Sequence, residues 1–294
     1  MQAMALEAID ASAAGTVTLG GDLEIRRLGF GAMRITGEGI WGPPPDREGA
    51  KAVLRRAIEL GVNFIDTAYA YGPEVSEELI AEALHPYPGG LVIATKGGLT
   101  RSGPGQWERD GRPEHLREVC EGSLRRLRVE RIDVYQLHSV DPKVPLEESV
   151  GALAELRNQG KIAHVGVSNV DLDELQRARE IVPVVSVQNR YSISERESDP
   201  VLDRCEGGGL AFIPWFPLAA GRVGGGVIDR IAADHDATPF QVALAWLLAR
   251  SPAMVPIPGT SSIEHLEENI AAASLRLSED EVAELGATAD SARA

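Results

Sequence analysis

The sequence has little of what a secreted, membrane-spanning or nucleic-acid-binding protein needs. Only two of its 294 residues are cysteines, and its 29 basic residues are outnumbered by 44 acidic ones, which gives a net charge of −15. Nucleic acids and anionic membrane surfaces both attract basic patches, so this balance argues against either as a partner. No window approaches 18 uncharged apolar residues, so we expect no transmembrane helix.

The two cysteines also exclude a disulfide framework. Cys120 and Cys205 lie far apart in the sequence and show no metal-ligand spacing. Cys120 falls on the apolar stripe of a predicted helix, which is typical of a buried, unreactive thiol. A reducing, cytoplasmic location fits this cysteine usage. Residues 1–15 contain acids and lack the basic start of a signal peptide, so we expect them to form a flexible tail.

What the sequence does contain is a repeated alternation of short apolar runs and helical segments. The runs are rich in β-branched residues and nearly continuous in apolar ones, as parallel strands buried on both faces require. Eight such units with no linker between them predict a closed (β/α)8 TIM barrel, with residues 16–294 as a single domain. A doubly wound open sheet is the alternative, but the Gly-x-Gly-x-x-Gly expected after its first strand is absent.

An N-terminal β-hairpin around Gly20-Gly21-Asp22 precedes these units and is placed to cover the bottom of the barrel. The expected strands span 16–19, 23–25, 28–33, 64–67, 91–95, 132–137, 162–167, 184–188, 210–216 and 254–257. The expected helices span 46–60, 74–84, 114–127, 146–158, 172–180, 201–206, 227–235, 239–250, 263–273 and 279–285.

Chemically useful side chains follow several of these strands, at the end where barrel enzymes have their active sites. Asp66 follows the second barrel strand, Lys96 the third and His138 the fourth, while Tyr71 lies on the loop after Asp66. Taken singly, each residue is about as well explained by a turn, a solvated loop or a packing position. Taken together, an acid, a phenol, an amine and an imidazole at one mouth are difficult to explain by packing.

These four residue types suit proton transfer to a carbonyl oxygen. A tyrosine has a pKa near ~10, and a lysine about 4 Å away would stabilise the phenolate by roughly 4 kcal/mol at an effective dielectric near 20. That attraction would lower the tyrosine pKa by up to about 3, as an upper bound. Asp66 would keep Lys96 charged and oriented, and His138 would direct a carbonyl oxygen towards Tyr71. Tyr71 is therefore the expected proton donor in hydride reduction of a carbonyl group.

With their contexts, these residues resemble the catalytic tetrad of the aldo-keto reductase superfamily. The matching segments are Asp66-Thr67-Ala68-x-x-Tyr71-Gly72, Thr95-Lys96, Tyr135-Gln136-Leu137-His138, Gly166-Val167-Ser168-Asn169, Gln188-Asn189-x-Tyr191 and Ile257-Pro258-Gly259-Thr260. The resemblance runs from about Gly15 to the last helix. It implies a (β/α)8 barrel that binds a nicotinamide dinucleotide without a Rossmann domain and reduces aldehydes or ketones reversibly.

The resemblance also implies which residues contact the cofactor. Ser168, Asn169 and Gln188 are expected to bind the carboxamide, and Trp215 is expected to stack on the nicotinamide ring. The other expected contacts are Gly31, Ala32, Met33, Asp66, Phe216, Pro217, Leu218, Gly221, Arg222, Ile257, Gly259, Thr260, Ser261, His265, Glu268 and Asn269.

The adenosine end departs from the best-known family members. Those often carry a lysine and an arginine around the 2′-phosphate, where this chain has Gly259 and His265. The residues from Thr260 onwards do open a helix, whose N-terminus attracts anions. The resemblance favours NADP(H), and NAD(H) or dual use stays open.

The substrate is expected to be a small carbonyl compound. The expected pocket residues are Trp41, Tyr71, Trp107 and His138. The segment after Leu285 is short, so we expect an open pocket that tolerates varied aldehydes and ketones, with sugar-derived carbonyls and pyridoxal among the candidates. The sequence decides neither among these nor the oligomeric state.

Two other functions compete with a reductase. Some relatives of the family are non-catalytic, cofactor-binding regulatory subunits with the same fold, and the presence of the four residues does not exclude that role. A metal-dependent barrel hydrolase is disfavoured because the six histidines show no clustering at metal-ligand spacing.

Overall fold

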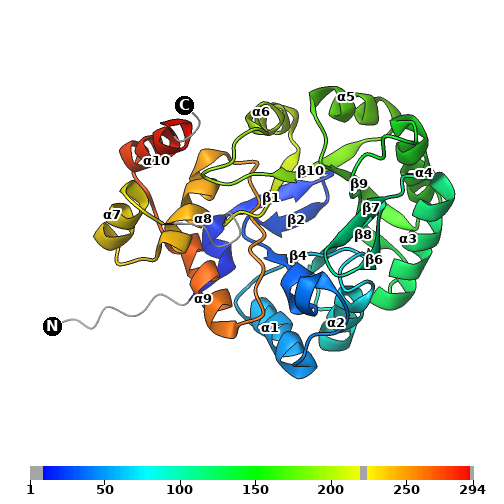
Figure 1. Cartoon of the computed structure of the whole chain (residues 1–294), viewed down its shortest axis with the longest axis horizontal. Helices are drawn as coiled ribbons and strands as arrows, with labels where there is room; N and C mark the ends of the chain where they lie inside the picture. The colour runs from blue at the N-terminus through cyan, green and yellow to red at the C-terminus, as the bar shows by residue number, and fades with distance from the viewer. Residues whose placement is uncertain (1–8, 219–223, 292–294) are drawn as a thin grey trace.

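A computed structural model describes residues 9–218 and 224–291, and these form a barrel of parallel strands wrapped by helices (Figure 1). The strands are β1 Thr16–Leu19, β2 Leu23–Arg26, β3 Phe30–Gly31, β4 Phe64–Asp66, β5 Val92–Gly97, β6 Leu99–Gly103, β7 Gln106–Arg109, β8 Ile132–Leu137, β9 Ile162–Ser168, β10 Val184–Arg190 and β11 Ala211–Trp215. The α-helices are α1 Arg47–Glu59, α2 Val75–Leu84, α3 Pro113–Leu127, α4 Leu146–Asn158, α5 Leu172–Ile181, α6 Asp199–Gly208, α7 Val227–Asp234, α8 Pro239–Arg250, α9 Ile263–Ala271 and α10 Glu279–Ser291. Short 3-10 helices are η1 Ala11–Ala14, η2 Ala32–Ile35, η3 Glu38–Ile40 and η5 Ala272–Ser274.

Seven parallel strands form the barrel sheet in the order β3-β4-β5-β8-β9-β10-β11. The eighth expected strand, 254–257, is not a regular strand, because Pro256 and Pro258 have no N–H to donate to a ladder. This segment nevertheless fills the gap between β11 and β3. Backbone hydrogen bonds close the ring, from Phe212 to Ala253, from Val255 to Phe212, from Gly29 to Pro256 and from Gly31 to Pro258. The (β/α)8 barrel is therefore complete.

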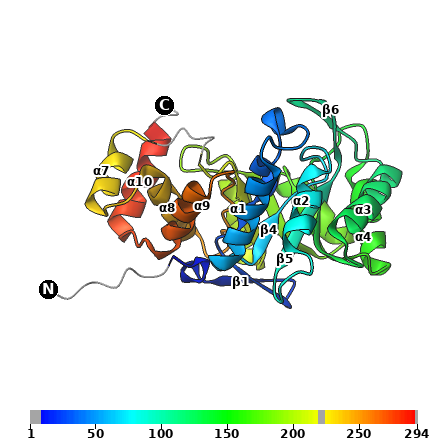
Figure 2. The same ribbon diagram turned by 90° about the horizontal axis from the view of Figure 1, so that it is seen from below.

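Apolar side chains fill the barrel interior, and the N-terminal hairpin closes its lower end. Leu19 and Ile25 of β1 and β2 belong to the same buried cluster as inward-facing strand residues such as Phe64 and Val134. Figure 2 shows β1 at one end of the barrel and β6 at the other. The expected hairpin therefore covers the bottom and leaves the opposite end for a site.

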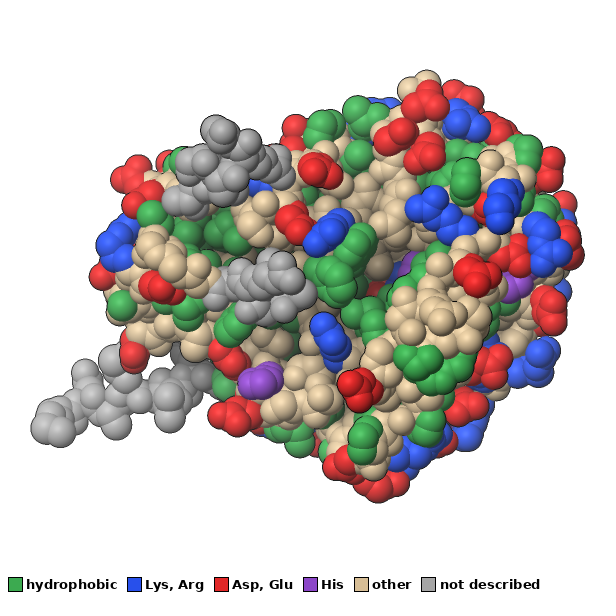
Figure 3. All heavy atoms as spheres, viewed as in Figure 1, with side chains coloured by type: hydrophobic (Ala, Val, Ile, Leu, Met, Phe, Trp, Pro, Cys, Tyr) green, Lys and Arg blue, Asp and Glu red, His purple; other side chains and the backbone are tan. Residues whose placement is uncertain are grey.

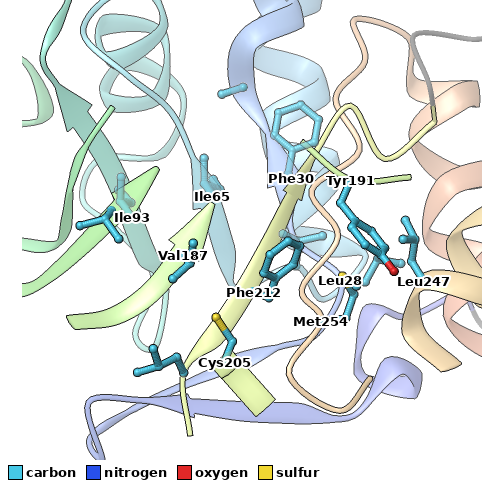
Figure 4. Packing of buried hydrophobic residues seen from close by; sticks show 14 of the residues in the cluster. Leu28, Phe30, Ile65, Ile93, Val187, Tyr191, Cys205, Phe212, Leu247 and Met254 are labelled. Carbon is cyan, nitrogen blue, oxygen red and sulfur yellow. The ribbon is translucent and has the colours of Figure 1, made fainter. Parts of the chain in front are cut away.

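Outward-facing strand residues pack beneath the helices in a second, larger cluster. In Figure 4, Phe212, Tyr191 and Met254 lie near one another, with Leu247 of α8 beside Tyr191. The Tyr191 ring lies 5.5 Å from the Phe212 ring and is stacked 6.4 Å from Trp246. This packing anchors α8 against the wall formed by β11 and the closing segment.

Helix starts follow from local sequence signals. Asp171 and Thr238 form capping boxes with Glu174 and Gln241 at the first turns of α5 and α8. Asp46 caps α1 by accepting a hydrogen bond from the Gly49 N–H. These signals explain why the predicted helix positions agree closely with the observed ones.

Besides the segment 254–257, several elements differ from the sequence expectation, among them α6, which is expected over 201–206 and spans Asp199–Gly208. The first barrel strand, expected over 28–33, is only Phe30–Gly31, because η2 begins at Ala32. The last helix continues to Ser291 rather than ending at residue 285. The segment 97–112, expected to be a loop, contains the antiparallel hairpin β6–β7, in which Leu99 pairs with Arg109.

The segment before β1 also differs from the expectation. Residues 1–8 of the expected tail lie outside the described residues, but Ala11–Ala14 form η1. Ala11 and Ala14 are buried, and the Ala11 N–H donates to the Leu60 carbonyl at 2.9 Å. Regular structure therefore begins before Thr16.

The burial expected of Cys120 is confirmed, and Cys205 is buried as well. Cys120 and Cys205 are both buried free thiols, and burial raises the pKa of each to about 12. Thiols with such a pKa are unreactive near neutrality. Within residues 9–218 and 224–291, no helix has the length and apolar character needed to cross a membrane.

Candidate active site

Lys96 lies at the centre of a buried polar cluster at the upper end of the barrel. Its side chain is fully buried, and Nζ donates to Oδ2 of Asp66 at 2.6 Å and to the Thr67 carbonyl at 2.8 Å. The Tyr71 hydroxyl lies 3.4 Å from the same Nζ atom. Asp66 is the last residue of β4 and Lys96 belongs to the neighbouring β5, so strand pairing fixes this arrangement.

Asp66 is itself held by two amide side chains. Its Oδ1 accepts hydrogen bonds from Nε2 of Gln188 at 2.8 Å and from Nε2 of Gln136 at 3.1 Å. Gln136 was not among the expected site residues, although a glutamine inside the apolar run of β8 is a signal that could have identified it. Both carboxylate oxygens are therefore occupied, and Asp66 is suited to orient Lys96.

Burial and neighbouring charges compete in setting the pKa values of Lys96 and Tyr71. Burial disfavours the charged form of Lys96, but the Asp66 carboxylate and the Tyr71 hydroxyl outweigh this effect and raise the pKa of Lys96. For Tyr71, burial outweighs the attraction of Lys96, so the pKa of the phenol is raised above 10. The lowered tyrosine pKa expected from the lysine alone is therefore wrong in this environment. Near neutrality Tyr71 is a protonated phenol beside a charged ammonium.

His138 follows β8 and faces Tyr71. The two rings meet edge to face at 5.9 Å, and Trp107 lies 6.4 Å from each of them. Burial, together with the charge of Lys96, lowers the pKa of His138 well below 6.5, so the imidazole is neutral at physiological pH. Its Nδ1 atom is buried and has no hydrogen-bond partner within the described chain.

A cleft of about 760 Å³ opens above these residues, on the face that is hollowed near its middle in Figure 3. The lining residues are Gly31, Met33, Arg34, Ile40, Asp66, Tyr71, Leu99, Trp107, Arg109, His138, Ser139, Ser168, Asn169, Gln188, Trp215, Phe216, Pro217, Leu218, Phe240, Ile257, Pro258 and Gly259. A cleft of this volume, lined mainly by apolar and aromatic side chains with a few polar groups, is typical of a site for a cofactor or a small substrate.

Most of the expected cofactor contacts line this cleft, and six do not. Those away from the lining are Ala32, Thr260, Ser261, His265, Glu268 and Asn269. The Glu268 carboxylate is engaged by the Thr238 hydroxyl at 2.6 Å. Gly221 and Arg222 fall outside the described residues. Of the four expected substrate residues, Tyr71, Trp107 and His138 line the cleft and Trp41 does not.

The residues expected around the nicotinamide form one connected group. The Ser168 hydroxyl donates to the Gln188 carbonyl at 2.7 Å, and Nδ2 of Asn169 donates to the His138 carbonyl at 2.9 Å. The Trp215 indole N–H donates to Oδ1 of Asn169 at 2.9 Å. Asn169 has a φ of 57°, in the left-handed region where non-glycine residues are uncommon. These bonds orient Trp215 at the edge of the cleft, where a flat ring fits the dinucleotide expected there.

The far end of the cleft has no room for a side chain at Gly259. A Cβ atom there would lie 2.4 Å from the Gly31 carbonyl oxygen. Nearby, α9 begins with Ser262 as its cap, and the Ser262 hydroxyl accepts a hydrogen bond from the His265 N–H. The close approach of two backbones therefore explains the glycine where better-known family members have a lysine.

Within the described residues, no three His, Cys, Asp or Glu side chains gather in a way that could hold a metal ion. The titratable groups gathered around Tyr71 are its own phenol, the Lys96 ammonium, the Asp66 carboxylate and the neutral His138 imidazole.

Comparison with known proteins gives relatives that cover nearly the whole chain. The sequence profile of the Aldo/keto reductase family matches residues 27–227 and 224–290. An uncharacterised oxidoreductase of Schizosaccharomyces pombe is 51% identical over 283 residues, which are 96% of this chain and 92% of the relative. Pyridoxine 4-dehydrogenase of Escherichia coli is 44% identical over 272 residues, 90% of this chain and 95% of the relative.

Solved structures agree in fold. The crystal structure of an aldo-keto reductase from Klebsiella pneumoniae in complex with NADPH matches with a TM-score of 0.79 at 30% identity, over 93% of this chain and 94% of that one. The fold, the profile match and the curated relatives lead to one conclusion: the chain belongs to the aldo/keto reductase family of oxidoreductases.

Proposed function

We propose that this protein reversibly reduces aldehydes or ketones to alcohols with NAD(P)H, and that Tyr71 donates the proton. The observation that carries this proposal is the buried hydroxyl of Tyr71, 3.4 Å from the Lys96 ammonium at the floor of the cleft. When bound, the nicotinamide supplies the hydride to the carbonyl carbon. The residues of the chain then have to position the carbonyl and protonate its oxygen.

Proton transfer follows from the environment of Tyr71. As the carbonyl oxygen gains negative charge, the protonated phenol gives up its proton, and the neighbouring ammonium of Lys96 stabilises the phenolate that forms. Asp66 keeps Lys96 charged and in place through its 2.6 Å contact. Neutral His138, in edge contact with Tyr71, is placed to donate a hydrogen bond to the same oxygen. In the reverse direction, the Tyr71 phenolate accepts the proton of the alcohol.

For the cofactor we favour NADP(H), and NAD(H) or dual use remains an alternative. A cleft whose lining includes the rings of Trp215 and Phe216 and the backbone of Gly31 and Gly259 supports a dinucleotide as the ligand. The related structure from Klebsiella pneumoniae is a complex with NADPH, which supports the phosphorylated form.

For the substrate we propose a carbonyl group attached to a flat ring. Three rings, from Tyr71, His138 and Trp107, meet edge to face at the expected substrate end of the cleft, and such a surface suits an aromatic aldehyde. The Escherichia coli relative is named pyridoxine 4-dehydrogenase. Pyridoxal is the aldehyde that corresponds to the alcohol pyridoxine. Pyridoxal is therefore the first compound to test.

The test is consumption of NADPH with pyridoxal and with a nitrobenzaldehyde, by the wild-type protein and by Tyr71→Phe. We expect turnover by the wild type and a loss of about 100-fold or more in Tyr71→Phe, the range for loss of a positioned acid. NADPH binding, followed by tryptophan fluorescence, should be unchanged in the variant. Retention of most activity would refute the role of Tyr71. Tight NADPH binding without turnover on a broad carbonyl panel would instead indicate a cofactor-binding regulatory subunit.

A further inference from the structure

Arg101 connects the hairpin β6–β7 to two other loops at the mouth of the cleft. Its guanidinium donates five hydrogen bonds, and every acceptor is a backbone carbonyl. The acceptors are Gln106 at 2.8 Å, Ile40 at 2.8 Å, Gly39 at 2.9 Å, Ala70 at 3.2 Å and Gly103 at 3.3 Å. An arginine presents five N–H donors in a rigid fork, so one side chain can satisfy all of these carbonyls.

The five carbonyls come from three segments of the chain. Gly39 and Ile40 belong to η3 between β3 and α1, Ala70 to the loop after β4, and the other two to the hairpin itself. Ala70 directly precedes Tyr71, the proposed proton donor. A single, partly exposed guanidinium fork therefore joins the hairpin to the loop that carries Tyr71.

The Gly39–Ile40 segment needs such support, because its backbone is strained. Ile40 has a φ of 58° and Gly39 a φ of 67°, and a β-branched residue in the left-handed region is a genuine outlier. Strained conformations of this kind persist only where the surroundings hold them, and they gather at functional sites. Arg101 accounts for a bond to each of the two carbonyls, and the Ile40 side chain lines the cleft.

Arg101 also fixes Trp107. The guanidinium lies 3.7 Å from the centroid of the Trp107 ring, so it covers one face of the indole. The ring is 38% exposed, lines the cleft and meets Tyr71 and His138 edge to face. Since Arg101 occupies one face of the indole, a ligand ring in the cleft can contact the ring only from its remaining exposed surface.

We propose that Arg101 is a positioning residue that sets substrate selectivity, by holding Trp107 and Ile40 as fixed walls against which a flat-ring carbonyl compound lies. The inference rests on the proposed reductase function. It assigns Arg101 no contact with the reacting atoms: the residue acts through the two walls. A lysine at this position would keep the charge but has three donors and no flat face for the indole.

The experiment compares Arg101→Lys with wild type on pyridoxal and on propanal, which has no ring. We expect KM for pyridoxal to rise about tenfold, with KM for propanal and both kcat values within about twofold of wild type, because the lost contacts with the ring are equally strong in the ground state and the transition state. The dissociation constant for NADPH, from fluorescence, should not change. Arg117→Lys is the matched control, since Arg117 is an exposed arginine on α3 that pairs with Glu155 away from the cleft.

A spectroscopic readout follows the wall itself. The emission of Trp107 is obtained as the difference between each protein and its Trp107→Phe counterpart. We expect this emission to become more accessible to acrylamide in Arg101→Lys and to stay unchanged in Arg117→Lys. Kinetics and Trp107 accessibility like those of wild type would overturn the proposal. An equal KM rise for both aldehydes with weaker NADPH binding would also overturn it, by showing general loosening.

Trp107→Ala keeps the proposal testable if Arg101→Lys folds poorly, because it removes one wall and leaves the five carbonyl bonds of Arg101 in place. Trp107→Ala should raise KM for pyridoxal and leave KM for propanal unchanged. If the ratio of the two KM values were the same in Trp107→Ala as in the wild type, the inference would be refuted. Failure of the proposed function looks different: wild-type protein would then reduce neither aldehyde, while acrylamide quenching would still report whether Arg101 holds Trp107.

Discussion

The Nζ atom of Lys96 and the Oδ2 atom of Asp66 lie 2.6 Å apart, and both side chains are almost completely buried. Burial of two charges is costly, and their attraction repays the cost only where further hydrogen bonds satisfy both groups. Here the Thr67 carbonyl accepts from the ammonium, and Gln136 and Gln188 donate to the carboxylate. The pair is therefore an oriented unit, and removal of one member leaves the other charge uncompensated.

Asp66→Asn should consequently damage both stability and activity. The amide has nearly the same shape, but Lys96 loses its counter-ion, so we expect the free energy of unfolding to fall by about 3–5 kcal/mol, the usual cost of breaking a buried pair. Turnover should fall as well, because an uncharged or displaced Lys96 no longer stabilises the Tyr71 phenolate. Urea unfolding and steady-state rates measure the two effects.

Glu155→Gln provides the control for Asp66→Asn. Glu155 pairs with Arg117 on the surface, where both side chains are more than a third exposed, so its loss should change stability by less than about 0.5 kcal/mol. If Asp66→Asn were as stable as this control, the pair would not be compensating a buried charge.

The buried histidine predicts how stability depends on pH. The pKa of His138 in the folded protein is well below 6.5, because burial and the charge of Lys96 disfavour the imidazolium. Below pH 6.5, His138 takes up a proton in the unfolded chain but not in the folded chain. The contribution of neutral His138 to the free energy of unfolding is therefore present above pH 6.5 and is lost as the pH falls. The loss approaches about 1.4 kcal/mol per pH unit. In His138→Gln, the unfolding free energies at pH 7.5 and pH 5.5 should differ by less than they do in the wild type. An equal difference in the two proteins would contradict the prediction.

The same pKa directions predict the activity profile. Tyr71 has a pKa raised above 10 by burial, and His138 has one far below 6.5, so neither changes charge between pH 6.5 and 9. We expect kcat for reduction to be flat across this range, measured at saturating NADPH and aldehyde. If the wild-type kcat profile changed slope near pH 8, and the residual activity of Tyr71→Phe did not, the phenol would titrate within this range.

Trp215 should report cofactor binding. Its indole N–H is fixed by Asn169 at 2.9 Å and its ring lines the cleft, so a bound nicotinamide stacked on it should quench its emission. Trp215→Leu should lose most of the NADPH-dependent quench and bind NADPH more weakly. Trp41→Phe is the control, because Trp41 lies outside the cleft lining and should leave the quench intact. A full quench in Trp215→Leu would rule out stacking on this ring.

The barrel and the meeting of Asp66, Tyr71, Lys96 and His138 follow from sequence alone, because each residue lies at or just after the end of an apolar run. Parallel strands bring such positions to one end of the sheet. What each does in catalysis remains a prediction that the variants above test. The raised pKa of Tyr71 could not be foreseen, since it depends on how completely the surrounding loops bury the ring.

Other features leave no trace in the sequence pattern. The hairpin β6–β7 lacks an apolar alternation, since every residue of β7 is exposed. The hydrogen-bond acceptors that face the Arg101 guanidinium are backbone carbonyls, and carbonyls are the same whatever residue carries them. The closing segment 254–257 has the apolar composition of a strand, but Pro256 within it and Pro258 after it limit its hydrogen bonds.

The adenosine end of the cleft gives a prediction about cofactor preference. Installing the family's lysine as Gly259→Lys should not improve NADPH binding, because a Cβ there would lie 2.4 Å from the Gly31 carbonyl oxygen. The atom that the new Cβ meets is a backbone oxygen of the barrel, so no flexible side chain can move aside to make room. We expect a loss of thermal stability and weaker binding of NADPH and NADH alike. Gly259→Ala, which adds only the Cβ, should show the same loss of stability.

His265→Arg tests the same end of the cleft without that obstruction. His265 is exposed in the first turn of α9, where the helix N-terminus already favours an anion, so a longer cation can be added without displacing backbone. If the 2′-phosphate lies there, the ratio of NADPH to NADH affinity should rise by about tenfold, equal to roughly 1.4 kcal/mol. Fluorescence titrations of the wild type, Gly259→Lys and His265→Arg with NADPH and NADH measure this ratio. An increase in Gly259→Lys would show that the two backbones can separate, and an unchanged ratio in His265→Arg would show that the phosphate binds elsewhere.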